Sequence, residues 1–209
     1  MTARGRWVDP FAGMPGQRLF IAVPLPPTAV EEIIRVVEDV RAMPLAVGMR
    51  DVRWVRLDGL HLTLRFLGPT PPVRVEPTAA AIRSVAVRTA PSTGRLAGTG
   101  VFPPHGRPRT LWIGLTDGVA ALSQLALDLD AALEAAGWPR DGRPFRAHLT
   151  LARSDGIAAG SLVADRLEAA FGDRAIPFAI DRLVLFESLT GGGPARYIPV
   201  TEASLEGTR

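Results

Sequence analysis

The tetrapeptide His-Leu-Thr-Leu occurs twice in this chain, at residues 61–64 and at residues 148–151. Side chains alternate between the two faces of an extended strand, so the histidine and threonine of each copy lie on one face and its leucines on the other. The copies are 87 positions apart, which is too far for a short repeat and suits a duplicated half-domain. We therefore expect two related halves, each with one strand that buries leucines and presents an imidazole and a hydroxyl.

The two copies contain two of the three histidines in the chain. Imidazole has an ordinary pKa of about 6.5, so a pair can hold a proton donor and a proton acceptor at one pH. We predict that His61 and His148 form an acid–base pair, and that Thr63 and Thr150 donate hydrogen bonds to an oxyanion. One histidine in a strand would favour a structural role, and the repetition favours catalysis. The third histidine, His105, is predicted to be a solvated loop residue.

Composition excludes several classes of site and favours none of the others strongly. The 209 residues include no cysteine, so disulfides, thiolate nucleophiles and cysteine-ligated metals are excluded. All 24 basic residues are arginine, and the net charge is only +3, which does not indicate a nucleic-acid-binding stripe. The histidines lack the spacing of a zinc site, so we expect no metal and no cofactor.

No apolar run approaches the length that spans a membrane, and the first 17 residues contain no apolar segment typical of a secretory signal. The sequence therefore predicts a soluble, cytoplasmic protein that does not enter a membrane.

The pattern along the chain predicts an α+β fold with antiparallel sheets, in which helices cover one face and the other face lines a cleft. A capping box of Thr28 and Glu31 would begin the first helix, and Asp117 would cap a long helix that ends at Gly137. Residues 52–57 and 61–67 read as two strands joined around Asp58-Gly59. Expected strands are 18–23, 52–57, 61–67, 96–102, 110–115, 145–151, 178–186 and 197–201, and expected helices are 29–43, 77–88, the stretch after 117, and 162–171.

Strand parity gives different predictions for two arginines that follow the motifs. Arg65 lies four positions after its histidine, hence on the same face, and is predicted to contact substrate. Arg153 lies five positions after its histidine, so alternation places it on the opposite face unless the strand ends, bends or bulges there. Of the aromatic residues, Phe66 is predicted to be core, whereas Phe20 and Trp112 are open between core and base stacking. We include Phe20 among the substrate-binding candidates.

Four segments together resemble a known family: Arg-Leu-Phe-Ile-Ala at 18–22, His-Leu-Thr-Leu-Arg-Phe-Leu-Gly at 61–68, Arg-Pro-Arg-Thr-Leu-Trp at 107–112, and His-Leu-Thr-Leu-Ala-Arg at 148–153. They resemble the two-histidine phosphoesterase superfamily, and more narrowly the bacterial and archaeal RNA 2′,3′-cyclic phosphodiesterases, also called 2′-5′ RNA ligases. The match runs from about Arg18 to Val200. It divides the chain into an N-terminal extension, 1–17, and a single domain, 18–209, with two lobes that each carry one motif.

The resemblance implies a bilobal, pseudo-twofold fold in which the motif strands face each other across a phosphate-sized cleft. It also implies that water opens a 2′,3′-cyclic phosphate at an RNA end to a 2′-phosphomonoester without a metal. In that scheme His61 protonates the departing 3′ oxygen and His148 takes a proton from the water, while Arg153 contacts the phosphate. The resemblance also implies a reversible ligation that joins RNA ends through a 2′-5′ link. The expected partner is an RNA end, and we expect a monomer with no obligate protein partner.

Two alternatives stay open at the level of sequence. The same chemistry would serve another cyclic phosphate, for instance one on ADP-ribose, or a 2′-5′ linked oligonucleotide, because the phosphate site is shared. In a different class, the cleft would bind an RNA end or a nucleotide without turnover. The presence of both histidines favours an enzyme over such a binding module.

Overall fold

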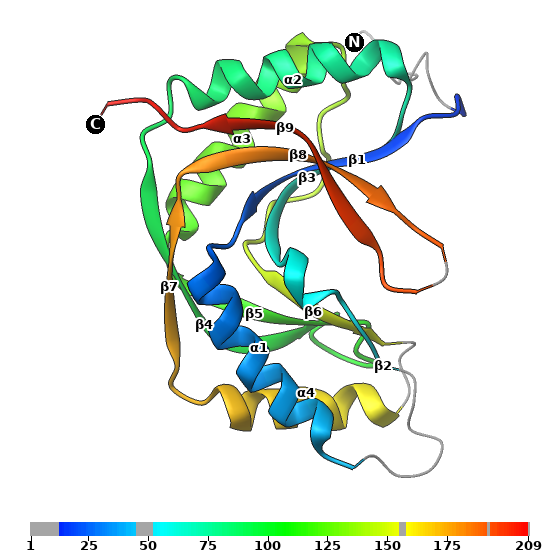
Figure 1. The fold of residues 1–209 in the computed structure, drawn as a ribbon, viewed down its shortest axis with the longest axis vertical. Coiled ribbons are helices and arrows are strands. Elements are labelled where there is room, and N and C mark those ends of the chain that lie inside the picture. The colour runs from blue at the N-terminus through cyan, green and yellow to red at the C-terminus, as the bar shows by residue number, and fades with distance from the viewer. Residues whose placement is uncertain (1–12, 45–51, 155–157, 192, 209) are drawn as a thin grey trace, which may run out of the picture.

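A computed structural model describes residues 13–44, 52–154, 158–191 and 193–208 (Figure 1). The chain has the expected α+β architecture, with two sheets in which every paired strand is antiparallel. The four-stranded sheet has the order β3-β1-β8-β9, with β1 Gln17–Pro24, β3 His61–Thr70, β8 Arg182–Leu189 and β9 Arg196–Ser204. The five-stranded sheet has the order β2-β6-β5-β4-β7, with β2 Val52–Trp54, β4 Ser92–Phe102, β5 Thr110–Asp117, β6 Leu149–Ser154 and β7 Ala175–Ile180. Each sheet contains one of the two motif strands, β3 or β6.

In the described part of the chain, four helices cover the outer faces of the sheets: α1 (Pro27–Ala42), α2 (Pro72–Ala86), α3 (Val119–Ala135) and α4 (Ala158–Phe171). The helices α2 and α3 pack together on the four-stranded sheet, whereas α1 and α4 pack together on the five-stranded sheet (Figure 1). In sequence, α3 connects β5 to β6 of the five-stranded sheet although it packs on the other sheet. The helix α1 follows β1 of the four-stranded sheet and precedes β2 of the five-stranded sheet. Both helices therefore connect the two sheets.

The core is built from the apolar patterns that the sequence displays. Leu122, Leu125, Leu129 and Leu133 form the inner face of α3 and are all at most 1% exposed, which confirms the predicted stripe. The motif leucines, Leu62 and Leu64 on β3 and Leu149 and Leu151 on β6, are buried as well. Burying one such side chain contributes roughly 1.5–3 kcal/mol, so each motif strand is held to its lobe by its leucines.

The helix starts differ from those expected. Pro26 is the N-cap residue of α1, and no side chain caps the helix, so the predicted capping box of Thr28 and Glu31 is wrong. The helix begins at Pro27 because proline is favoured at the first position, where its missing N–H leaves no bond unmade. The helix α2 begins at Pro72 for the same reason, five residues before the expected start.

The start of α3 also differs. Its N-cap residue is Gly118, whose φ of 83° suits a residue without Cβ, and Asp117 instead ends β5. Gly137 (φ 85°) follows the C-terminal end of the helix, as predicted.

One strand pairing and one strand boundary were predicted incorrectly, because the chain passes from one sheet to the other where its apolar pattern continues. Residues 52–57 and 61–67 do not form a hairpin: β2 pairs with β6 in the five-stranded sheet, and a short 3₁₀ turn at Leu57–Gly59 leads to β3 in the other sheet. Likewise the expected strand 178–186 is two strands, β7 and β8, which belong to different sheets and separate at Asp181. A change of sheet leaves no gap in hydrophobicity, so periodicity alone does not reveal it.

None of the helices in the described part of the chain is long and apolar enough to span a membrane. Of the predicted N-terminal extension, residues 1–12 lie outside the described residues.

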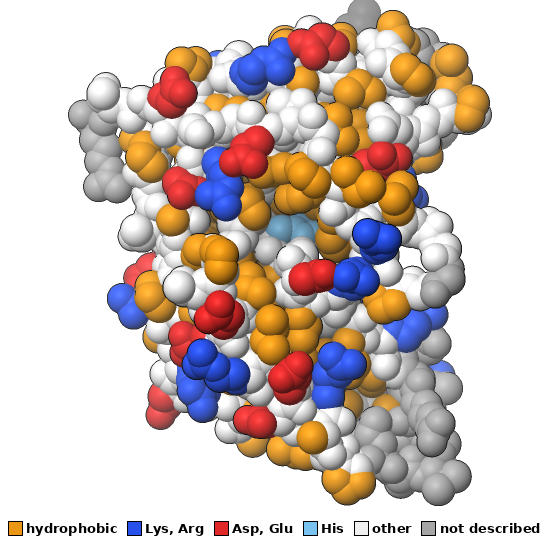
Figure 2. Space-filling model, viewed as in Figure 1, with side chains coloured by type: hydrophobic (Ala, Val, Ile, Leu, Met, Phe, Trp, Pro, Cys, Tyr) orange, Lys and Arg blue, Asp and Glu red, His pale blue; other side chains and the backbone are white. Residues whose placement is uncertain are grey.

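Figure 2 shows acidic and basic side chains intermixed over one face of the molecule, with a histidine in a hollow near its middle.

Candidate active site

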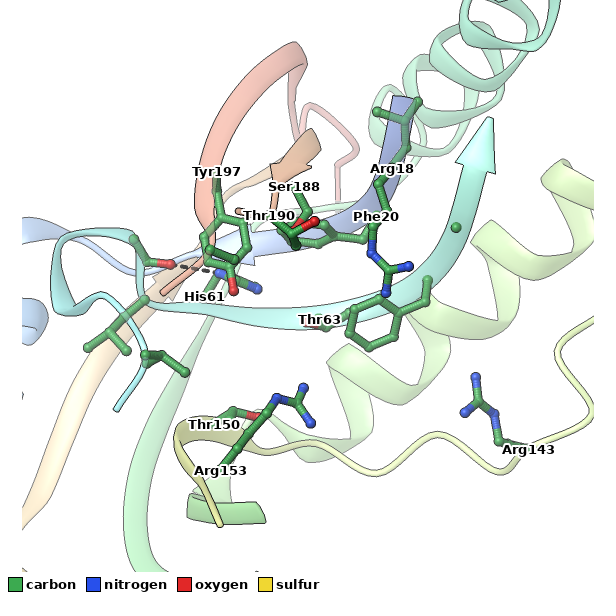
Figure 3. A pocket seen from close by; sticks show the side chains of 17 residues that line it. Arg18, Phe20, His61, Thr63, Arg143, Thr150, Arg153, Ser188, Thr190 and Tyr197 are labelled. Carbon is green, nitrogen blue, oxygen red and sulfur yellow. Dashed lines mark hydrogen bonds between the residues drawn. The ribbon is translucent and has the colours of Figure 1, made fainter. Parts of the chain in front are cut away.

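The first motif places His61 at the start of β3, an edge strand of the four-stranded sheet. Its Nδ1 lies 2.7 Å from the backbone oxygen of Gly59 (Figure 3). A carbonyl oxygen only accepts, so Nδ1 carries the hydrogen and donates it. The other ring nitrogen, Nε2, is left to exchange a proton with a ligand.

Aromatic side chains of the same sheet surround His61. Its ring centroid lies 4.7 Å from that of Phe20, 4.9 Å from that of Tyr197, which meets it edge-on, and 5.8 Å from that of Phe186. Burial lowers the pKa of His61 below the ordinary 6.5, and the hydrogen bond to Gly59 acts in the opposite sense. Phe20 is only 2% exposed and stacks on Phe186 at 5.3 Å, so its ring supports His61 from within the sheet.

The second motif repeats this arrangement in the other sheet. His148, immediately before β6, has its Nδ1 2.7 Å from the backbone oxygen of Arg146, again two residues upstream, so Nδ1 donates here too. Its ring meets Phe102 edge-on at 5.0 Å and lies 6.4 Å from Trp112. Burial lowers the pKa of His148, the bond to Arg146 raises it, and the positive charge of Arg153 lowers it further.

A cavity of about 550 Å³ lies between the motif strands. Its lining includes His61 and Thr63 of the first motif and Thr150 of the second, with Arg153 beside Thr150 (Figure 3). His148 is not part of this lining; it shares the strand face of Thr150 two residues away, next to the cavity. Among the described residues, those that line the cavity include three arginines and no acidic side chain.

Both motif strands bulge at the last leucine of the motif. On β3, Ala22 and Ile21 of β1 pair with Thr63 and Arg65, so Leu64 is the extra residue. On β6, Trp112 and Leu111 of β5 pair with Thr150 and Ala152, which leaves out Leu151 in the same way. An extra residue reverses the alternation beyond it. The fourth position after each histidine therefore faces the core, and the fifth position faces the cavity.

The bulges decide the two arginine predictions and one aromatic prediction. Arg153, at the fifth position, reaches the cavity because β6 bulges, and its charge acts on both His148 and Tyr197 of the opposite sheet. Phe66, at the fifth position of the first motif, is 54% exposed and lines the cavity, so the prediction that it is core is wrong. Arg65, at the fourth position, turns away, and parity placed it on the wrong face.

Arg65 is instead buried between β3 and the chain that leads to the second motif. Its side chain is 8% exposed; Nη1 lies 2.8 Å from a carboxylate oxygen of Asp130 on α3 and 3.5 Å from one of Asp141. Nη2 donates to the backbone oxygen of Pro139. Asp130 also accepts a hydrogen bond from the backbone N–H of Asp141, at 3.0 Å. Arg65 thus connects the first motif strand to the segment that ends at His148.

Several cavity residues were not predicted from the sequence. Tyr197 lies over His61, and burial raises the pKa of its phenol while Arg153 acts in the opposite sense, so the hydroxyl stays protonated and can donate. Arg18 comes from β1, and Arg143 from the chain between α3 and β6. Tyr197 is the single tyrosine of the chain, but nothing in its sequence context indicates a site. Ser188 and Thr190 complete the set of polar side chains that were missed.

In the described residues, no group of three or more His, Cys, Asp or Glu side chains is arranged to hold a metal ion.

Two strands that face each other across a cavity, each with a histidine held in the same tautomer and a threonine beside it, define a two-histidine phosphoesterase. Comparison with known proteins agrees: the family model of the 2′-5′ RNA ligase superfamily matches residues 25–192. This chain belongs to that superfamily.

Individual relatives and solved structures are similar to this chain as well. An RNA 2′,3′-cyclic phosphodiesterase of Geobacillus stearothermophilus is 38% identical over 135 residues, which are 64% of this chain and 41% of that protein. The matched segments span 41% to 58% of the length of the first three curated relatives. Among solved structures, TT0787 of Thermus thermophilus has a TM-score of 0.70 at 28% identity, covering 92% of this chain and 100% of that one. Escherichia coli LigT complexed with 3′-AMP has a TM-score of 0.68 at 26% identity, covering 90% and 98%.

Proposed function

We propose that this protein hydrolyses the 2′,3′-cyclic phosphate at an RNA end to a 2′-phosphomonoester. A water oxygen attacks phosphorus, the bond from phosphorus to the 3′ oxygen breaks, and a 3′-hydroxyl is released. His148 accepts the proton of the attacking water, and His61 donates a proton to the departing oxygen. The same step with the 5′-hydroxyl of a second RNA end in place of water would form a 2′-5′ link: the 5′ oxygen bonds to phosphorus, and the bond from phosphorus to the 3′ oxygen breaks. We place this activity in the cytoplasm, in a monomer that needs no metal.

The observation that carries the proposal is the matched state of the two histidines. Each Nδ1–H is engaged by a backbone oxygen two residues upstream, which orients Nε2 as the reactive nitrogen in both motifs. A neutral imidazole in this tautomer accepts a proton at Nε2, and the imidazolium donates one from the same atom. Opening a cyclic phosphodiester needs one group of each kind, each worth roughly 10²–10⁴-fold in rate.

The charge of the cavity supports an anionic substrate. Arg153 offers a planar fork that suits phosphate oxygens, and Thr63 and Thr150 supply hydroxyl donors from opposite sides. Relatives named RNA 2′,3′-cyclic phosphodiesterase, and the similar fold of a protein that was crystallised with 3′-AMP, support a nucleotide as the ligand.

The proposal is tested by the product formed from an RNA oligomer that ends in a 2′,3′-cyclic phosphate. In the presence of a metal chelator we expect hydrolysis to the 2′-phosphate alone, because the proton donor is assigned to the 3′ oxygen. Chromatography against synthetic 2′- and 3′-phosphate standards identifies the product. Formation of the 3′-phosphate would contradict the assignment of the proton donor to the 3′ oxygen. Loss of turnover with chelator would contradict the metal-free mechanism.

The pH dependence follows from the lowered pKa of both histidines. His148 must be neutral to accept a proton, so kcat/KM falls as the pH drops below its pKa; His61 must be charged to donate, so kcat/KM falls as the pH rises above its pKa. Both values lie below 6.5 in the free protein, so we expect the kcat/KM optimum on the acid side of 6.5.

A bound phosphate anion favours the imidazolium, so the alkaline limb of kcat should lie at higher pH than that of kcat/KM. Initial rates between pH 4.5 and 9, together with NMR titration of the imidazole protons, measure both effects. An alkaline limb of kcat/KM near pH 8 would contradict the assignment of His61 as the acid.

A further inference from the structure

The cavity extends well beyond the two motifs along β3. Phe66 lines it with 54% of its surface exposed, whereas the ring of Phe20 is enclosed by its neighbours. Phe66 occupies the same position after its bulge as Arg153 does in the other half. The two halves thus present an aromatic ring at one place and a cation at the equivalent place. An exposed ring in a polar cavity suits the face of a base, which stacks on aromatic side chains.

Two arginines lie at the Phe66 end of the cavity. Figure 3 shows Arg18 and Arg143 both on the side of the site away from His61 and Tyr197, while Arg153 lies beside Thr150. Arg18 makes no ion pair within the described part of the chain. Arg143 donates from Nε to Asp141 at 3.3 Å, which orients the guanidinium and leaves its two Nη groups on the other edge.

The position of Arg18 along the sheet separates it from the reacting phosphate. Arg18 pairs with Pro69 of β3, eight residues beyond His61, and two of the intervening residues are bulged. At about 3.3 Å per residue, six steps place the two backbones roughly 20 Å apart along the strand. Arg18 therefore enters the cavity at the end away from His61, where a second anion of the same ligand would lie.

We propose that Arg18 and Arg143 form a second phosphate subsite, which binds the phosphodiester on the 5′ side of the terminal nucleotide while Phe66 stacks the terminal base. A 2′,3′-cyclic phosphate occupies the 3′ end of an RNA, so the remaining chain leaves the site from the 5′ oxygen of that nucleotide. This inference rests on the proposed function and narrows its substrate: an oligonucleotide end is preferred to a nucleoside 2′,3′-cyclic phosphate, which has no 5′ phosphodiester.

The test compares kcat/KM for a nucleoside 2′,3′-cyclic phosphate and for a dinucleotide with the same terminal base and cyclic phosphate. Arg18→Gln and Arg143→Gln are each expected to lower the dinucleotide value about 10-fold, the cost of losing a charged hydrogen bond, and to change the mononucleotide value less than about 2-fold. Phe66→Ala should lower both values to a similar extent, about 10-fold, since both substrates carry the terminal base. Arg35→Gln, on the exposed face of α1, is the matched control and should change neither.

Equal losses on the two substrates, or no loss on the dinucleotide, would overturn the second subsite while leaving the hydrolysis of cyclic phosphates intact. If the unmodified protein turned over neither substrate, the proposed function would fail, and the subsite would still be judged by binding. Calorimetry with a 3′-phosphorylated dinucleotide and a 3′-phosphorylated mononucleotide should then give a ratio of affinities that both arginine variants reduce. A ratio that the variants leave unchanged would refute the subsite without any reference to turnover.

Discussion

His61→Ala and His148→Ala are each expected to lower kcat/KM for the opening of an RNA 2′,3′-cyclic phosphate roughly 10²–10⁴-fold. Each variant removes the imidazole that its lobe holds at the motif: the Nδ1 bond to Gly59 or to Arg146 is lost together with Nε2. The double variant should be little worse than either single variant, because an acid and a base that act in one step are not additive. Single-turnover rates with the RNA substrate measure all three.

His105→Ala supplies the matched control for these variants. It removes the third histidine of the chain, which is exposed on the loop between β4 and β5, so its kcat/KM should stay within about 2-fold of the unmodified value. If either motif variant retained activity while folding normally by circular dichroism, the acid–base pair would be refuted. A double variant as damaging as the product of the two single losses would show that the two histidines contribute independently and not as a coupled pair.

Arg65→Met is expected to destabilise the protein by about 3–5 kcal/mol, the effect of removing one partner from a buried ion pair. Methionine preserves most of the apolar stem, but it leaves the carboxylate of Asp130, 20% exposed, without its cation, and the backbone oxygen of Pro139 without its donor. The free energy of unfolding from urea titration measures the loss. Adding Asp130→Leu to Arg65→Met should recover part of it, since a pair of apolar side chains replaces the uncompensated charge.

An exposed ion pair in the same lobe provides the control for the destabilisation expected of Arg65→Met. Arg83 on α2 contacts Glu76 with 48% and 77% of the side chains exposed, so Arg83→Met should cost less than about 1 kcal/mol. If Arg65→Met destabilised the protein no more than Arg83→Met, the ion pair of Arg65 with Asp130 would not stabilise the connection between β3 and the segment that ends at His148.

The parts of the fold that could be predicted are those that depend on local pattern. Alternation placed the motif leucines in the core, and it placed Thr63 and Thr150 on the opposite strand faces, which line the cavity. The spacing of the leucines in α3 predicted its buried face correctly. The duplication predicted two related halves with one motif strand each, and the structure has one motif strand in each sheet.

The parts that could not be predicted depend on a single residue in the register or on the partner of a strand. Leu64 and Leu151 look like ordinary strand leucines, yet each is the extra residue of a bulge, so Arg65, Phe66 and Arg153 all lie on faces that simple alternation does not give. A bulge is fixed by the neighbouring strand, which sequence does not identify. The same holds for β2, whose partner β6 is about 100 residues away.

The way in which α1 and α3 connect the two sheets determines how rigidly the site is held. The helix α3 connects two strands of the five-stranded sheet but packs on the four-stranded sheet, and α1 follows a strand of the four-stranded sheet and packs on the five-stranded side. Neither sheet can therefore move away from its partner without unpacking buried helix faces. The entropy lost in bringing an acid and a base to opposite sides of one phosphate is therefore lost when the chain folds and not when the substrate binds. In this architecture, the effective concentration of one imidazole relative to the other is a property of the hydrophobic core.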